Sequence, residues 1–270
     1  TPTRLPRMAD ALEFMTLDNE ARTNVGTGIA WMDYHFNHVQ NGTAPNYFGN
    51  TDWISAVLSS NAPQQNYAVN VNGNLGRSGY LMSYRYFDQA GLTVGNSTGE
   101  ERHNLRFKVD SRLLDKVEIS SNIGYTMRNV VSPVGSLTSG GGAIYTAMRI
   151  APNVPVYYTD GSWAYGGGNT NPVAILYDGG TTTLDADEMS LMSTAKIELL
   201  KGWDLSATYS MVNRNSLAEV LRKSIPFVNP ETPESPVYIF NNPNSLNLTD
   251  VRQRQQTLIV QSNFDLNFGK

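Results

Sequence analysis

The sequence predicts an all-β fold in which about seven antiparallel strands form part of a transmembrane β-barrel. Polar and apolar residues alternate along most of the proposed strands, which gives each strand one apolar and one polar face. The connections also alternate strictly: turns near residues 75, 114 and 201 are short, whereas the links that begin near 91, 131 and 218 are longer. Short periplasmic turns and long extracellular loops are typical of outer-membrane β-barrels.

Four of these strands are predicted within residues 64–130. The strand near Val117 shows the pattern most clearly, and the strands around Phe107 and Val69 repeat it. The strand from Tyr80 has an aromatic face, but its other face mixes polar and apolar residues. The apolar positions of the clearest strand are Val117, Ile119, Ile123, Tyr125 and Met127.

The rest of the chain divides into loops and strands around this block. Residues 1–63 are predicted as the first extracellular loop, with a short amphipathic helix before about residue 24 and an irregular, aromatic-rich stretch after it. Residues 131–188 and 218–250 are predicted as two further extracellular loops. Alternation resumes in two strands at residues 189–217 and in a final strand at residues 251–270.

The composition argues against several classes of protein. A net charge of −4 argues against a nucleic-acid binder, because phosphate binding needs a basic stripe. The absence of cysteine excludes disulfide frameworks, thiol catalysis and thiolate metal sites. No apolar run approaches the roughly 20 residues of a membrane helix, so any membrane crossing must use strands. The chain begins at Thr1 without a signal peptide, and we expect it to be a piece of a longer protein.

Enzyme and metal sites find little support in the sequence. Asp33, His35 and His38 have helix-like spacing for a zinc site, but no fourth ligand is nearby, which favours solvated loop histidines. Acidic residues at 185–188 lack the spacing and glycine of a calcium loop. No phosphate loop, nucleophile elbow or acid–base carboxylate pair stands out. The sequence therefore predicts that the chain is not an enzyme and binds no metal or cofactor.

Aromatic loop residues are the best candidates for ligand contact, because aromatic rings stack on sugar rings and pack on peptide groups. Asp160 and Asn169 would add directional hydrogen bonds. For any single residue, packing between loops or against a lid protein is the alternative interpretation. The aromatic candidates are Trp31, Tyr34, Trp53, Trp163 and Tyr165.

Several segments carry a resemblance to a known family. They are Thr51-Asp52-Trp53, Ala62–Tyr67, Tyr80–Leu92, Arg102–Arg106, and Asn171–Ala174 after the Asp160-Gly161 turn. In order and spacing they resemble the early barrel and the third extracellular loop of SusC/RagA-type TonB-dependent transporters. The resemblance covers nearly the whole chain.

The resemblance implies one part of a large barrel of about twenty-two strands, with the plug domain and the remaining strands outside this sequence. It implies active import of a large nutrient, a glycan or an oligopeptide, across the outer membrane. A SusD-like surface lipoprotein would cap the extracellular loops, TonB would act through the plug, and outer-membrane lipid would contact the apolar strand faces. Polar strand residues would face the lumen: Asn104, Arg106, Lys108, Glu118, Asn122 and Arg128.

Two other classes stay open. One is a passive porin or structural outer-membrane barrel, which would lack the plug and its coupling segment. The other is a soluble carbohydrate-binding β-sandwich, in which the apolar faces would pack on a core and no detergent would be needed. Neither accounts for the strict alternation of short turns and long loops together with the matched segments.

Overall fold

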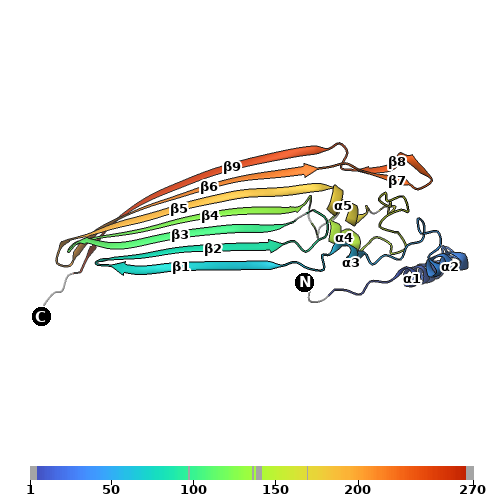
Figure 1. Ribbon diagram of the computed structural model, residues 1–270, viewed down its shortest axis with the longest axis horizontal. Helices are drawn as coiled ribbons and strands as arrows, with labels where there is room; N and C mark the ends of the chain where they lie inside the picture. Colours follow the sequence, from blue (N-terminus) through green and yellow to red (C-terminus); the bar gives the residue numbers. More distant parts are fainter. Residues whose placement is uncertain (1–4, 97, 136, 138–141, 169, 266–270) are drawn as a thin grey trace.

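The computed structural model describes residues 5–96, 98–135, 137, 142–168 and 170–265. Its main element is one antiparallel sheet of seven strands, long and curved, with helices gathered at one end (Figure 1). The spatial order β1-β2-β3-β4-β5-β6-β9 follows the chain, which confirms the predicted up-and-down all-β fold. The strands are β1 (Gln64–Leu75), β2 (Ser78–Ala90), β3 (Gly99–Leu114), β4 (Val117–Pro133), β5 (Gly180–Leu200), β6 (Trp203–Arg222) and β9 (Ser245–Phe264).

Tight turns and long connections leave from opposite ends of the sheet, which we call the turn end and the loop end (Figure 1). At the turn end, β1 and β2 are joined across Gly76 and β5 and β6 across Gly202, with φ angles of +60° and +81°. Glycine adopts such positive φ angles without the steric cost of a Cβ atom. The segment before β1 and the long β4–β5 connection carry every helix of the described chain, and all of them lie towards the loop end (Figure 1).

In the part of the chain that the structure describes, five helices and one hairpin lie at the loop end. Among the described residues, no helix is long and apolar enough to cross a membrane. The elements are α1 (Ala11–Asn24), α2 (Asp33–Asn41), α3 (Trp53–Val57), α4 (Ala143–Ala147), α5 (Pro172–Asp178) and the hairpin of β7 (Ile225–Asn229) and β8 (Thr232–Phe240).

The largest buried clusters lie at the loop end rather than on the sheet. Trp53 of α3, Ala147 of α4 and Leu176 of α5 belong to one apolar cluster, which joins three loops that are distant in the sequence. A second cluster packs Ala174 of α5 against Phe227 of β7. The loops therefore form a packed cap that holds its own side chains in place.

Three segments differ from the predicted organisation. Residues 26–63, predicted to be irregular, contain α2 and α3, which are too short to show a clear helical period. β5 begins at Gly180, earlier than predicted. The sequence pattern did not indicate this start, because the threonines after Gly180 suit a strand but do not alternate in polarity. Residues 218–250 contain the end of β6, the β7–β8 hairpin and the start of β9. The prolines in that stretch favoured a loop, but proline is tolerated in an edge strand of a hairpin. The predicted strand positions 266–270 lie outside the described residues.

Candidate functional site

The polar face of the sheet gathers the six residues that the sequence predicted for a lumen. Lys108 of β3 lies opposite Asn122 of β4, and Arg102 lies opposite Arg128. Residues directly opposite each other in an antiparallel pair point to the same face. The register therefore places all six on one side of β3 and β4: Asn104, Arg106, Lys108, Glu118, Asn122 and Arg128.

Cross-strand ion pairs occupy this polar face from one end to the other. Arg128 donates two hydrogen bonds to Glu100, at 3.0 and 2.9 Å. Nearer the turn end, Lys196 lies 3.0 Å from Asp204, and Arg112 pairs with Glu118. The pairs link neighbouring strands and orient long side chains along the polar face of the sheet.

The opposite face is apolar and uncovered over the middle of the sheet. Phe107 lies opposite Ile123, and Leu105 lies opposite Tyr125. Ile123 is 38% exposed, and many of its neighbours are exposed even more. Monomeric soluble proteins rarely leave so large a contiguous apolar surface open to water. The exposed residues of this face include Tyr67, Val69, Val71, Tyr84, Leu105, Phe107, Tyr125, Met127, Ile197, Tyr209, Leu258 and Val260.

Two of the predicted ligand contacts, Trp163 and Tyr165, lie in aromatic groups of the loop-end cap. The indole of Trp163 stacks on Tyr157 with 4.5 Å between ring centroids, and its N–H donates to Asp178 at 2.6 Å. The ring of Tyr165 lies 6.1 Å from Phe227 and 6.0 Å from Tyr238. Both residues keep part of their surface open, so they could contact a ligand or a partner.

Asp160 belongs to a tight turn that precedes these rings. Its Oδ1 atom accepts hydrogen bonds from the backbone N–H and the hydroxyl of Ser162, at 2.8 and 2.7 Å. The Ser162 hydroxyl is the main reason that the pKa of Asp160 lies below its usual value. The side chain thus stabilises the turn, and the residue is exposed. The other polar candidate, Asn169, lies outside the described residues.

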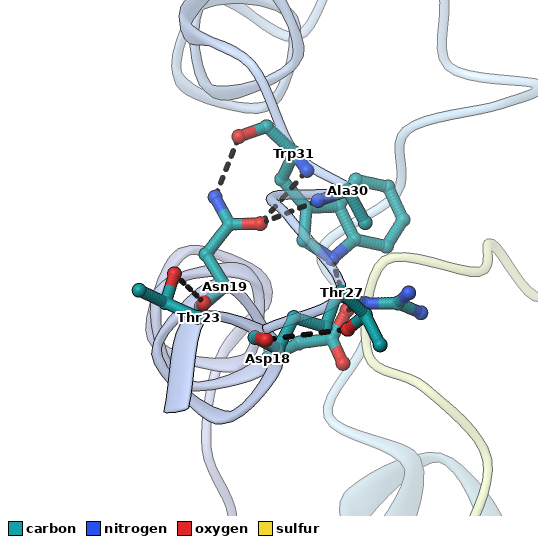
Figure 2. Close-up of polar contacts among 7 residues, drawn as sticks. Asp18, Asn19, Thr23, Thr27, Ala30 and Trp31 are labelled. Atoms are coloured by element: carbon teal, nitrogen blue, oxygen red, sulfur yellow. Dashed lines mark hydrogen bonds and ion pairs between the residues drawn. The ribbon is translucent and has the colours of Figure 1, made fainter. Parts of the chain in front are cut away.

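Trp31 lies at the corner between α1 and α2 (Figure 2), and Tyr34 is the second residue of α2. Asn19 of α1 accepts from the backbone N–H of Ala30 and Trp31, both at 2.9 Å, and donates to the Trp31 carbonyl. The Trp31 indole N–H donates to Asp18 at 2.8 Å. Trp31 is thereby held in the fold, whereas Tyr34 is 53% exposed.

Trp53 has a packing position. Its side chain is 2% exposed, and its indole N–H donates to the Ala151 carbonyl at 3.1 Å. The sequence alone showed an aromatic residue in a loop, which does not distinguish a packed ring from an open one. In the folded chain its ring packs in the apolar cluster with Ala147 and Leu176 and is not open to a ligand.

The histidines of the first loop have local partners. His35 Nδ1 accepts the backbone N–H of Met32 at 2.9 Å, and His38 Nδ1 lies 2.8 Å from the Thr43 hydroxyl. Within the described ranges, no group of three or more His, Cys, Asp or Glu side chains could hold a metal ion.

Two further features of the site were missed by sequence reasoning. Asn171 is fully buried and caps α5, which the Asn-Pro pair at a helix start could have indicated. Arg85 and Arg102 share the polar face with Asn104, as the parity of their positions could have shown.

Comparisons with known proteins agree with this geometry. No protein-family model matches the chain. TonB-dependent receptor P26 of Formosa agariphila is 27% identical over 175 residues, which is 63% of this chain and 16% of that protein. TonB-dependent receptor P3 of the same organism is 26% identical over 177 residues, 62% of this chain and 17% of that protein.

Solved structures share the fold over almost the whole chain. The RagAB peptide importer in its closed-closed state superposes with a TM-score of 0.70 at 15% identity, covering 98% of this chain and 31% of that chain. Its open-open state gives a TM-score of 0.67 at 16% identity, covering 97% and 30%. The chain is therefore similar to TonB-dependent receptors in sequence and to the RagAB importer in fold.

The chain spans 16 to 17% of the length of the curated relatives it matches. Both relatives are named as receptors and not as enzymes, which agrees with the prediction that the chain is not an enzyme.

Proposed function

We propose that the chain forms part of the wall and the loop-end cap of an outer-membrane barrel that actively imports a large nutrient. The observation that carries this proposal is the division of one seven-stranded sheet into a polar and an uncovered apolar face. Lipid would cover the apolar face, because only apolar side chains are tolerated there at low cost. The six polar residues from Asn104 to Arg128 would then line the lumen.

The family adds the energy source and the partners to this proposal. TonB would drive transport through a plug, and a SusD-like lipoprotein would close over the loop end. The cargo would be a glycan or an oligopeptide, and the RagAB neighbour is itself a peptide importer. Tyr34, Trp163 and Tyr165 are the open aromatic candidates for contact with cargo or lipoprotein.

Uptake by the full-length transporter tests this function. Cells that express the transporter should accumulate its nutrient only when TonB is active. The purified protein should require detergent and should copurify with a surface lipoprotein. Uptake that continues after deletion of TonB would instead indicate a passive porin. A protein that stays monodisperse without detergent would indicate the soluble sandwich.

A further inference from the structure

Four arginines form a continuous patch on the polar face at the loop end of β2, β3 and β4. Arg102 lies directly opposite Arg128, and Arg85 lies opposite Asn104, between the positions of Arg102 and Arg106. We call these four residues, Arg85, Arg102, Arg106 and Arg128, the arginine patch. Arg102 is only three positions from the start of β3, about 10 Å along the strand.

The arginine patch holds more positive charge than its neighbours neutralise. Glu100 is the carboxylate within it: it binds Arg128 through two hydrogen bonds and lies 3.9 Å from Arg102. Arg106 donates to the neutral amide of Asn122, and Arg85 has no hydrogen-bond or ion-pair partner among the described residues. Four arginines and one glutamate leave a local charge of +3 in a chain whose net charge is −4.

Elsewhere on the polar face, positive side chains pair with carboxylates, which distinguishes the arginine patch from the rest of the face. Towards the turn end, Lys108 pairs with Asp110, Arg112 with Glu118, and Lys196 with Asp204. Towards β6, Arg214 pairs with Glu188. The excess of cations is therefore confined to the part of the wall that lies just beneath the loops.

The geometry of the patch suits a carboxylate. The Glu100–Arg128 pair already shows a guanidinium on this face donating two hydrogen bonds to one carboxylate. The Arg102 guanidinium carbon lies 5.1 Å from the centre of the Phe87 ring, and its Nε atom is buried without a hydrogen-bond partner in the described chain. An arginine supported in this way loses little side-chain entropy when it binds a planar anion.

We propose that the arginine patch binds carboxylate groups of the imported cargo as it passes from the loops into the lumen. This inference rests on the proposed function and adds the charge of the cargo to it. Because the patch is at the loop end, a cargo that enters from outside would meet it soon after the cap. A surface with excess positive charge also attracts anions over a distance and raises their rate of association.

Binding of charged and neutral probes to the full-length transporter in detergent tests the proposal. The probes are hexaglutamate against hexaglutamine, and a galacturonate hexamer against its methyl ester, so that a peptide and a glycan source of carboxylates are distinguished. At least one charged probe should bind at least tenfold more tightly than its neutral counterpart. In R85Q/R106Q this preference should fall about tenfold, because two charge-assisted contacts are lost without leaving a carboxylate unpaired. The variant R77Q/R254Q removes two charges elsewhere and should keep the preference.

Equal binding of charged and neutral probes, no binding of either charged probe, or an unchanged preference in R85Q/R106Q would overturn the proposal. If R85Q/R106Q instead exposes the plug to protease while binding stays unchanged, the patch holds the plug and not the cargo. TonB-dependent uptake and detergent dependence are measured with the same proteins. A transporter that passes those two tests but shows no charge preference refutes the arginine proposal alone.

Discussion

Asn171 shows how a single buried side chain organises the loop end. Its Oδ1 atom accepts from the N–H groups of Val173 and Ala174, at 3.1 and 3.2 Å. Its Nδ2 atom donates to the carbonyls of Val156 and Ala164, at 2.8 and 3.2 Å. One amide therefore caps α5 and attaches the preceding loop to it.

Asn171→Ala is expected to destabilise the cap by about 2–4 kcal/mol, because buried N–H and C=O groups lose their partners. Hydrogen exchange measured by mass spectrometry should show faster exchange in α5 of the full-length protein. Asn37→Ala, at an exposed position of α2, serves as the control. Equal protection of α5 in both variants would show that the amide is dispensable.

Arginine substitutions at two neighbouring positions of β4 test which face of the sheet contacts lipid. Ile123→Arg places a charge on the apolar face and is expected to cost about 2–4 kcal/mol near the bilayer midplane. Asn122→Arg, one residue away on the polar face, is expected to cost little. The folded fraction of each variant in outer membranes can be measured from its gel mobility without heating. If both variants fold equally well, the assignment of faces is wrong.

The α1–α2 corner is an element whose order should depend on pH. The pKa of Asp18 is held below its usual value, first by the hydrogen bond from Arg22 and also by that from the Trp31 indole. A carboxyl whose pKa is lower in the folded state stabilises that state above its unfolded pKa, and this contribution is lost as the pH falls through the folded pKa. We therefore expect the corner to loosen below about pH 4.

The difference in tryptophan emission between the wild type and Trp31→Phe reports on this corner. It should change on acidification, and Asp18→Asn should remove most of that change because the titrating group is gone. A titration curve that is the same in Asp18→Asn would assign the effect to another group.

The strands were predictable from the sequence because the two faces of each strand lie in different environments. Val117 and Ile123 fall on one side and Glu118 and Asn122 on the other, so the alternation records the register directly. The cap was less predictable. Helices as short as α3 depend on long-range packing, and the contact of Trp53 with Ala151 joins residues far apart in the chain. Local patterns carry no information about such contacts.

At the scale of the whole molecule, the sheet is open within the described chain. β1 and β9 each have one neighbouring strand, so one edge of each is unpaired. Unpaired backbone groups are costly in lipid, because no water is present to satisfy them. The sheet therefore makes sense in a membrane only when further strands pair with both edges, as in a closed barrel.

Quenching by lipid tests the central claim, that this sheet is a barrel wall with lipid on its apolar face and the lumen on its polar face. The chain contains no cysteine, so single cysteines can be introduced at Ile123 and at Asn122 of a full-length protein whose other cysteines, where present, are replaced. Each is labelled with bimane and reconstituted into vesicles that contain brominated phospholipids. Strong quenching at position 123 and weak quenching at position 122 is the predicted result. Equal quenching at both positions, or quenching at neither, would contradict the account.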